Sequence, residues 1–191
     1  MADSPVMSSV SSGSIDTIMD GSVGADSDEA DPPEPPAAHE NLYLVDATAS
    51  FGAEDMSWLF ARATDVITLL ISEGHRIARL SLRLVDDQEM ADAHVRFSGV
   101  EGTTDVLCFH SDDEGVLEMD ILACVDEAGR QAMDHGHALR NEILLYAVHG
   151  ALHACGFDDA DPEDFKSMHA EEDRILKAIG VGPVFRKENG E

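Results

Sequence analysis

The sequence has few basic residues for its length. Lysine and arginine together number 12 among 191 residues, against 39 aspartate and glutamate residues, and the formal net charge is −27. Proteins that bind a nucleic-acid backbone usually present a basic surface, because contacts with phosphates dominate their affinity. The shortage of basic residues argues against a general nucleic-acid-binding protein and against DNA as a partner. Any function on RNA would depend on a local patch, a metal ion or a docking partner.

Long apolar runs and paired cysteines are also absent. No apolar run approaches the roughly 18–20 residues that a membrane helix needs, so we expect no membrane partner. No basic segment followed by an apolar one stands near residue 1, so we expect no secretory signal. The three cysteines, Cys108, Cys124 and Cys155, lack paired spacing. That usage fits a reducing cytoplasm better than a disulfide framework.

The composition divides the chain into a tail and one domain. Residues 1–40 contain acidic residues but neither lysine nor arginine, and serine, glycine and proline are dense there. Such a segment cannot bury enough apolar surface to offset its ordering entropy, so we expect a disordered acidic tail. Residues 41–182 are the expected folded domain, and residues 183–191 are the expected short C-terminal tail.

Periodicity predicts a mixed α+β domain, in which a sheet of about four strands packs with helices. Alternating apolar and polar residues predict the strands, and apolar residues at helical spacing predict the helices. Strands are expected at residues 42–45, 77–85, 104–109 and 117–124, with a loop at 111–115. Helices are expected at residues 54–75, 86–92, 125–135, 139–155 and 162–179.

The densest chemical signal lies near the end of the fourth predicted helix. His149 and His153 are four residues apart and therefore share one helix face. Gly156 follows the last turn and can adopt a positive φ, which would bring Asp158 or Asp159 back over both imidazoles. Two imidazoles and one carboxylate, with a fourth position open, are a ligand set of catalytic zinc. We therefore predict a metal site at the C-terminal end of this helix.

The same segment resembles a known family. The run from His149 to Asp159 is similar to H-G-x-L-H-x-x-G-Y-D-H, the metal-binding motif of the YbeY endoribonucleases, with Phe157 in place of tyrosine. The resemblance extends over about residues 41–180. Further similar segments are Thr104-Asp-Val-Leu107 with Phe109, Met119-Asp-Ile121, Gly136-His137 and Asn141-Glu142.

The resemblance implies a function that composition alone does not. It implies a single-strand-specific, metal-dependent endoribonuclease that matures ribosomal RNA at the 3′ end of the small subunit and serves ribosome quality control. The implied partners are ribosomal RNA and the small ribosomal subunit or its assembly factors, and the implied location is cytoplasmic. The implied cofactor is one Zn²⁺ per chain.

The metal ligands depart from the family pattern at one position. Three histidines bind zinc in the family, and here the ligands implied by the resemblance are His149, His153 and, in place of the third histidine, Asp159. An anionic third ligand favours a harder ion such as Mn²⁺ or Mg²⁺, so the identity of the metal stays open. Asp158 and His169 are the alternative third ligands.

Three further residues are candidates for roles beside the metal. The family usually carries an arginine where this chain has Ser98, and Arg96 would point to the same side if the backbone is extended there. Arg96 is therefore our candidate catalytic residue, and a solvated arginine is the alternative. Asp120 and Glu142 are candidates for orienting a metal-bound histidine. Ordinary structural hydrogen bonding, or exposure to solvent, is the alternative for both.

Two other functions stay open. A non-catalytic ribosome-assembly module would hold a structural metal, which normally has four protein ligands. A metal-dependent protease would need Glu142, Glu163 or Glu171 as its general base, because Gly150 stands where an H-E-x-x-H protease has glutamate.

Overall fold

The computed structural model of the chain describes residues 41–182 and 184. The tails predicted at residues 1–40 and 183–191 lie outside the described residues, apart from Val184, so those expectations stay predictions. The described elements are β1 (Leu42–Asp46), α1 (Ala53–Ser72), β2 (Arg76–Val85), α2 (Asp87–Ser98), β3 (Val106–Asp113), β4 (Val116–Cys124), α3 (Val125–His135), α4 (Leu139–Ala154) and α5 (Pro162–Ala178).

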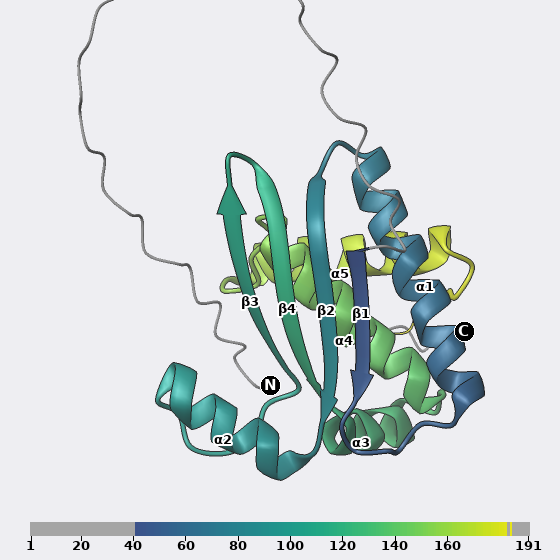
Figure 1. The fold of residues 1–191 in the computed structure, drawn as a ribbon, viewed down its shortest axis with the longest axis vertical. Helices are drawn as coiled ribbons and strands as arrows, with labels where there is room; N and C mark the ends of the chain where they lie inside the picture. Colours follow the sequence, from purple (N-terminus) through teal and green to yellow (C-terminus); the bar gives the residue numbers. More distant parts are fainter. Residues whose placement is uncertain (1–40, 183, 185–191) are drawn as a thin grey trace, which may run out of the picture.

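The strands form one mixed sheet in the order β1-β2-β4-β3 (Figure 1). β1, β2 and β4 run parallel, and β3 runs antiparallel to β4. The predicted α+β class with four strands is thus confirmed. The loop expected at 111–115 is mostly strand, because β3 continues to Asp113 and turns at Glu114 and Gly115. Both of these residues have positive φ, as a tight two-residue hairpin turn requires.

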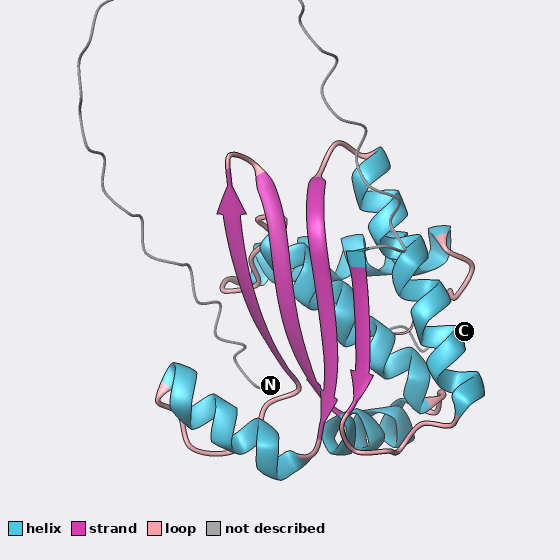
Figure 2. Cartoon of the chain, viewed as in Figure 1, coloured by secondary structure: helices cyan, strands magenta, loops and turns pink. Residues whose placement is uncertain are grey.

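Helices cover the two faces of the sheet unequally (Figure 2). α4 packs across β3 and β4, α1 packs beside β1 and β2, and α5 lies against α4. The side chains of β2 follow this division, since Leu80, Leu82 and Leu84 are buried in the main core. On the opposite face, α2 contacts β4 and covers one end of the sheet with a second, smaller apolar cluster.

α4 is the central helix of the domain. It contacts the sheet, α1, α3 and α5, and most of its side chains are buried on every side. Gly150 lets it approach β4 closely, because a Cβ atom there would lie 3.1 Å from Ile121 Cδ1. Polar groups on such a helix are removed from bulk water unless they open onto a cavity. The histidines of the predicted metal site lie on this helix.

α2 is longer than the sequence indicated. It spans Asp87–Ser98, whereas we expected a short helix over 86–92. Met90 and Ala93 are buried at helical spacing, and the Phe97 ring lies 4.8 Å from the Phe109 ring across to β3. These contacts stabilise the additional turns before Gly99 ends the helix with a φ of 72°.

The described residues contain no helix that is both long and apolar enough to cross a membrane.

The three cysteines, Cys108, Cys124 and Cys155, are free thiols. Burial raises the pKa of Cys155 to about 11, so this thiol is a weak nucleophile at neutral pH.

A candidate metal centre at the end of α4

Three side chains converge where α4 ends. His149 Nε2 and His153 Nε2 lie 3.0 Å apart. Asp159 Oδ2 lies 3.8 Å from His149 Nε2, and Asp159 Oδ1 lies 3.8 Å from His153 Nε2. His153 is buried, while His149 and Asp159 are partly exposed. The structure thus brings together the three residues that the sequence singled out as metal ligands.

Hydrogen bonds direct a lone pair of each histidine toward this point. His149 Nδ1 donates to the Glu172 carboxylate at 2.7 Å, and His153 Nδ1 donates to the Phe157 carbonyl at 3.1 Å. A histidine that donates from Nδ1 has, when neutral, its lone pair on Nε2. The two Nε2 atoms face each other at hydrogen-bond distance, where a metal ion can take the place of a shared proton. An acceptor behind each ring fixes its orientation.

The spacing and chemistry of the three groups fit a divalent ion. Ligand atoms about 2.0–2.2 Å from a tetrahedral zinc ion are about 3.3–3.6 Å apart, close to the spacings of 3.0 and 3.8 Å observed here. Burial lowers the pKa of His153, and the neighbouring His149 lowers it further, so the ring is available in the neutral form that binds metal. Burial opposes a charge on His149, but the carboxylate of Glu172 outweighs burial and raises its pKa.

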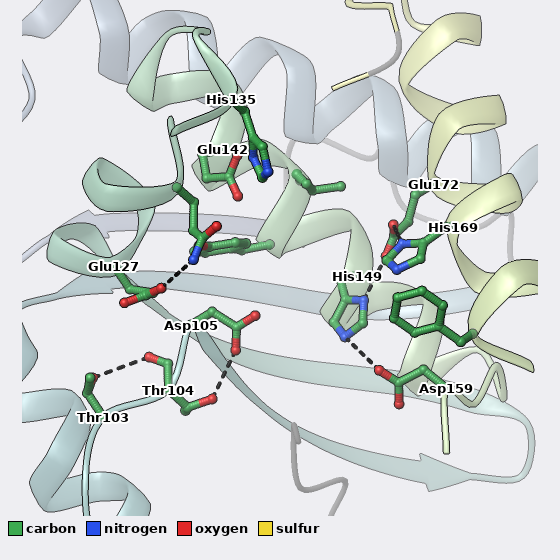
Figure 3. Close-up of a pocket in the computed structure, with 14 residues that line it drawn as sticks. Thr103, Thr104, Asp105, Glu127, His135, Glu142, His149, Asp159, His169 and Glu172 are labelled. Carbon is green, nitrogen blue, oxygen red and sulfur yellow. Dashed lines mark hydrogen bonds and ion pairs between the residues drawn. The ribbon is translucent and has the colours of Figure 1, made fainter. Parts of the chain in front are cut away.

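The loop after α4 decides which aspartate faces the histidines. Gly156 has a φ of 96°, which reverses the chain after the last helical turn. Asp158 is occupied within the turn, where its Oδ1 accepts the backbone N–H groups of Asp159 and Ala160 at 2.8 and 3.2 Å. Asp159 instead points toward His149 (Figure 3). The geometry therefore favours Asp159 over Asp158 as the third ligand.

The cluster opens onto a cavity of about 470 Å³ between α3, α4, α5 and the loop before β3. Its wall carries the carboxylates of Asp105, Glu127, Glu142, Asp159 and Glu172, together with His135, His149 and His169. Among residues 41–182, no lysine or arginine lines it. Carboxylates therefore outnumber histidines on the wall, and an anionic substrate would meet no lysine or arginine there.

Glu172 is a residue of the candidate site that the sequence analysis missed. Its side chain is fully buried, and its two oxygens accept hydrogen bonds from His149 Nδ1 and, at 2.6 Å, from His169 Nδ1. Burial alone would raise the pKa of this carboxyl, but the two histidines outweigh burial and hold the pKa below its ordinary value. A signal was present, because Glu172 shares the apolar stripe of α5 with Met168, Ile175 and Leu176. A carboxylate in such a stripe needs a partner.

Asp120, a candidate for orienting a metal-bound histidine, lies away from the cluster. Successive side chains of a strand point to opposite faces, and Ile121 is the neighbour that packs against α4. Asp120 lies on the other face, where the guanidinium of Arg79 contacts both of its oxygens, at 2.5 and 2.9 Å. This ion pair lowers the pKa of Asp120.

Arg96 also lies away from the cluster. The role expected for it required an extended backbone, but Arg96 is in the last turn of α2, and Ser98 is helical as well. Its guanidinium lies 5.2 Å from the centre of the Phe97 ring, and it does not line the cavity. The condition of an extended backbone is therefore not met, because the apolar contacts of α2 with β3 extend the helix.

Glu142 lines the cavity, but it contacts His137 rather than a histidine of the metal cluster. It is 2% exposed, and its Oε2 lies 2.9 Å from Nε2 of His137, while Glu172 takes the place beside His149. Burial raises the pKa of Glu142 to about 7. Glu142 is thus a buried acid in the cavity wall, in contact with the segment that joins α3 to α4.

The fold and the cluster together define a small α+β protein with a candidate metal centre of two histidines and one carboxylate. Residues 47–180 match the sequence model of a family described as Endoribonuclease YbeY. That match covers more than half of the chain. The chain therefore belongs to the YbeY endoribonuclease family.

Relatives from several bacteria carry the name Endoribonuclease YbeY. A Frankia alni protein is 36% identical over 138 residues, which are 65% of this chain and 76% of the relative. A Thermobifida fusca protein is 38% identical over 113 residues, which are 53% of this chain and 72% of the relative. A Gloeobacter violaceus protein is 40% identical over 122 residues, with coverages of 59% and 63%.

A solved structure supports the fold. The solution structure of a Thermotoga maritima protein aligns with a TM-score of 0.50 and 19% sequence identity. The alignment covers 78% of this chain and 99% of that protein. At this identity, the likeness concerns the arrangement of helices and strands alone.

Proposed function

We propose that this chain is a metal-dependent endoribonuclease that cleaves single-stranded RNA and matures ribosomal RNA at the 3′ end of the small subunit. We further propose a part in ribosome quality control, a cytoplasmic location, and contacts with the small subunit or its assembly factors. The family supplies the reaction class. The observation that carries the proposal is the convergence of His149, His153 and Asp159 on one point at the edge of an acidic cavity.

These three side chains are the proposed ligands of one Zn²⁺. A divalent ion held there supplies a Lewis acid for a phosphate oxygen and lowers the pKa of a bound water. Glu172 and the Phe157 carbonyl hold the two imidazoles in their binding orientation through hydrogen bonds at Nδ1. Asp159 brings a negative charge in place of a third neutral ligand, which makes Mn²⁺ the alternative ion.

The acidic cavity favours targeting by a partner over tight binding of free RNA. No lysine or arginine lines the cavity within residues 41–182, and the whole chain carries a formal charge of −27. RNA affinity therefore depends on bound cations and on docking to the ribosomal particle. We expect the protein to bind isolated RNA weakly at physiological salt.

The test is cleavage of a single-stranded RNA with the sequence of the small-subunit 3′ end by the purified full chain. We expect cleavage that is lost after chelation, restored by Zn²⁺ or Mn²⁺, and absent in His149→Ala. His75→Ala is the matched control, because His75 lies between α1 and β2 and does not line the cavity. The same RNA annealed to its complement should resist cleavage.

Other outcomes would overturn the proposal. Cleavage that survives both chelation and His149→Ala would come from a contaminating nuclease. No cleavage with any metal, combined with binding to small-subunit particles, would favour the assembly module. Cleavage of unfolded casein, lost in His149→Ala, would favour the protease. The number of candidate ligands argues against the assembly module. The cluster offers three among the described residues, whereas a structural zinc site normally has four.

A further inference from the structure

A second cluster of metal-ligating groups lies where α3 gives way to α4. His135 ends α3, Gly136 turns the chain with a φ of 75°, and His137 precedes the first turn of α4. Nitrogen atoms of the two histidines and an oxygen of Glu142 all lie within 4.8 Å of one another. His135 and Glu142 both line the cavity and lie side by side there (Figure 3).

The 2.9 Å contact between His137 Nε2 and Glu142 Oε2 requires a proton or a metal ion between the two atoms. His137 Nδ1 lies 3.3 Å from the Ala138 carbonyl, to which it can only donate. The neutral ring then directs its Nε2 lone pair at Glu142 Oε2, 2.9 Å away. Two facing acceptors repel each other unless a proton or a metal ion lies between them.

Burial makes this contact costly for the protein. The side chain of Glu142 is only 3% exposed. Neither Glu142 Oε2 nor His137 Nε2 has a well-formed hydrogen bond among the described residues. Apart from their contact with each other, these two atoms have no polar partner within residues 41–182 that forms a hydrogen bond, and such buried atoms are a reason to look for an unseen ion.

The second cluster is separate from the first. Glu142 and His149 are seven residues apart on α4, which places them about 10 Å apart along the helix at 1.5 Å per residue. Two ions that share one phosphate oxygen are about 3.5–4 Å apart. This backbone separation is much larger than the spacing of such a pair, which indicates a separate ion farther along the cavity wall.

We propose that His135, His137 and Glu142 form a second divalent-cation site in the same cavity. Two imidazoles and a carboxylate suit a borderline ion such as Zn²⁺, Co²⁺ or Mn²⁺. The site is weaker than the first, because His135 is exposed and the positive end of the α4 dipole opposes a cation. Its function is to give an acidic wall the positive charge that an RNA phosphate needs. This last step rests on the proposed nuclease function, whereas the metal site itself does not.

Titration of the chelator-treated full chain with Co²⁺ tests the site. Visible absorption and calorimetry should show two binding sites per chain of different affinity. Glu142→Gln, which keeps the shape of the buried side chain, and His135→Ala, at an exposed position, should each remove the weaker site and keep the tighter one. His149→Ala should remove the tighter site and keep the weaker one.

A control variant distinguishes a specific metal site from nonspecific binding of cations to an acidic surface. Asp134→Asn removes one charge next to His135 but no member of the cluster, so both sites should remain. A single site in the wild type, or a weaker site that survives both Glu142→Gln and His135→Ala, would overturn the proposal. Equal loss in Asp134→Asn would show surface binding only and would overturn it too.

RNA kinetics test the role of the site. His135→Ala should raise KM for the single-stranded RNA at least tenfold and change kcat less than twofold, because the cleavage centre stays intact. An unchanged KM would overturn the role in phosphate binding. The Co²⁺ titration contains no RNA, so it decides the metal site even if the chain cleaves no RNA.

Discussion

Glu172 on α5 accepts a 2.7 Å hydrogen bond from His149 on α4, so a buried carboxylate of one helix fixes a candidate metal ligand of another. The second oxygen of Glu172 is occupied by His169, which leaves the carboxylate little freedom to rotate. His149 Nε2 consequently faces His153 and Asp159. The orientation of the metal centre thus depends on how α5 packs against α4.

We predict that Glu172→Gln weakens metal binding about 10–100-fold. Glutamine has one acceptor oxygen, whereas Glu172 accepts from both His149 and His169, so one histidine loses its partner. Competition with a chromophoric chelator measures the affinity. Glu171→Gln is the control, because Glu171 pairs with Arg174 instead. An unchanged affinity in Glu172→Gln would show that the buried charge does not support the site.

We predict that Asp159→Ala lowers the metal affinity at least tenfold, while Asp158→Ala does not. Asp159 lies 3.8 Å from both ligand nitrogens, and Asp158 is engaged by backbone N–H groups of its own turn. Metal content after dialysis, measured by mass spectrometry, distinguishes the two variants. Full occupancy in Asp159→Ala would make Asp158 or His169 the third ligand.

We predict that Asp120→Asn leaves metal binding unchanged and costs at most about 1 kcal/mol of stability, because its ion pair with Arg79 is half exposed. Arg79 lowers the pKa of Asp120 from its ordinary 3.8. The unfolded chain therefore binds this proton at a higher pH than the folded one. The stabilisation is present above pH 3.8 and is lost as the pH falls through the lower, folded-state pKa.

Thermal unfolding at several pH values checks this prediction. The difference between wild type and Asp120→Asn should shrink as the pH falls below about 4. Glu118→Gln should have a smaller effect, since Glu118 makes a longer contact of 3.2 Å with Arg79. A loss of metal affinity in Asp120→Asn would restore the role that the sequence suggested.

We predict that Arg96→Ala changes kcat/KM for RNA cleavage less than twofold at physiological salt. Arg96 is exposed on α2 and does not line the cavity. Arg76→Ala is a charge-matched control, because Arg76 is exposed at the start of β2. A tenfold loss in Arg96→Ala alone would show that α2 contacts the RNA.

The sequence determined the elements of the fold and the ligand cluster. Apolar and polar residues alternate in β2, and apolar residues recur at helical spacing in α1. Both patterns are local and can be read from the sequence without the tertiary structure. His149 and His153 lie four residues apart on one helix, so local geometry already placed them together. The sequence also predicted a chain reversal at Gly156 that brings an aspartate back to the histidines, because glycine readily adopts the positive φ that such a tight turn needs.

Only the tertiary structure decided what surrounds those residues. The contact of Glu172 with His149 joins residues 23 positions apart on different helices, and no periodicity encodes such a pair. The side of the sheet on which Asp120 lies depends on strand register and on which face α4 covers. Arg96 was misplaced because packing of α2 on the sheet extends a helix that local signals end earlier. The spacing of His149 and His153 depends on a few neighbouring residues of one helix. The orientation of their rings and the charge of the cavity depend on several segments that packing brings together.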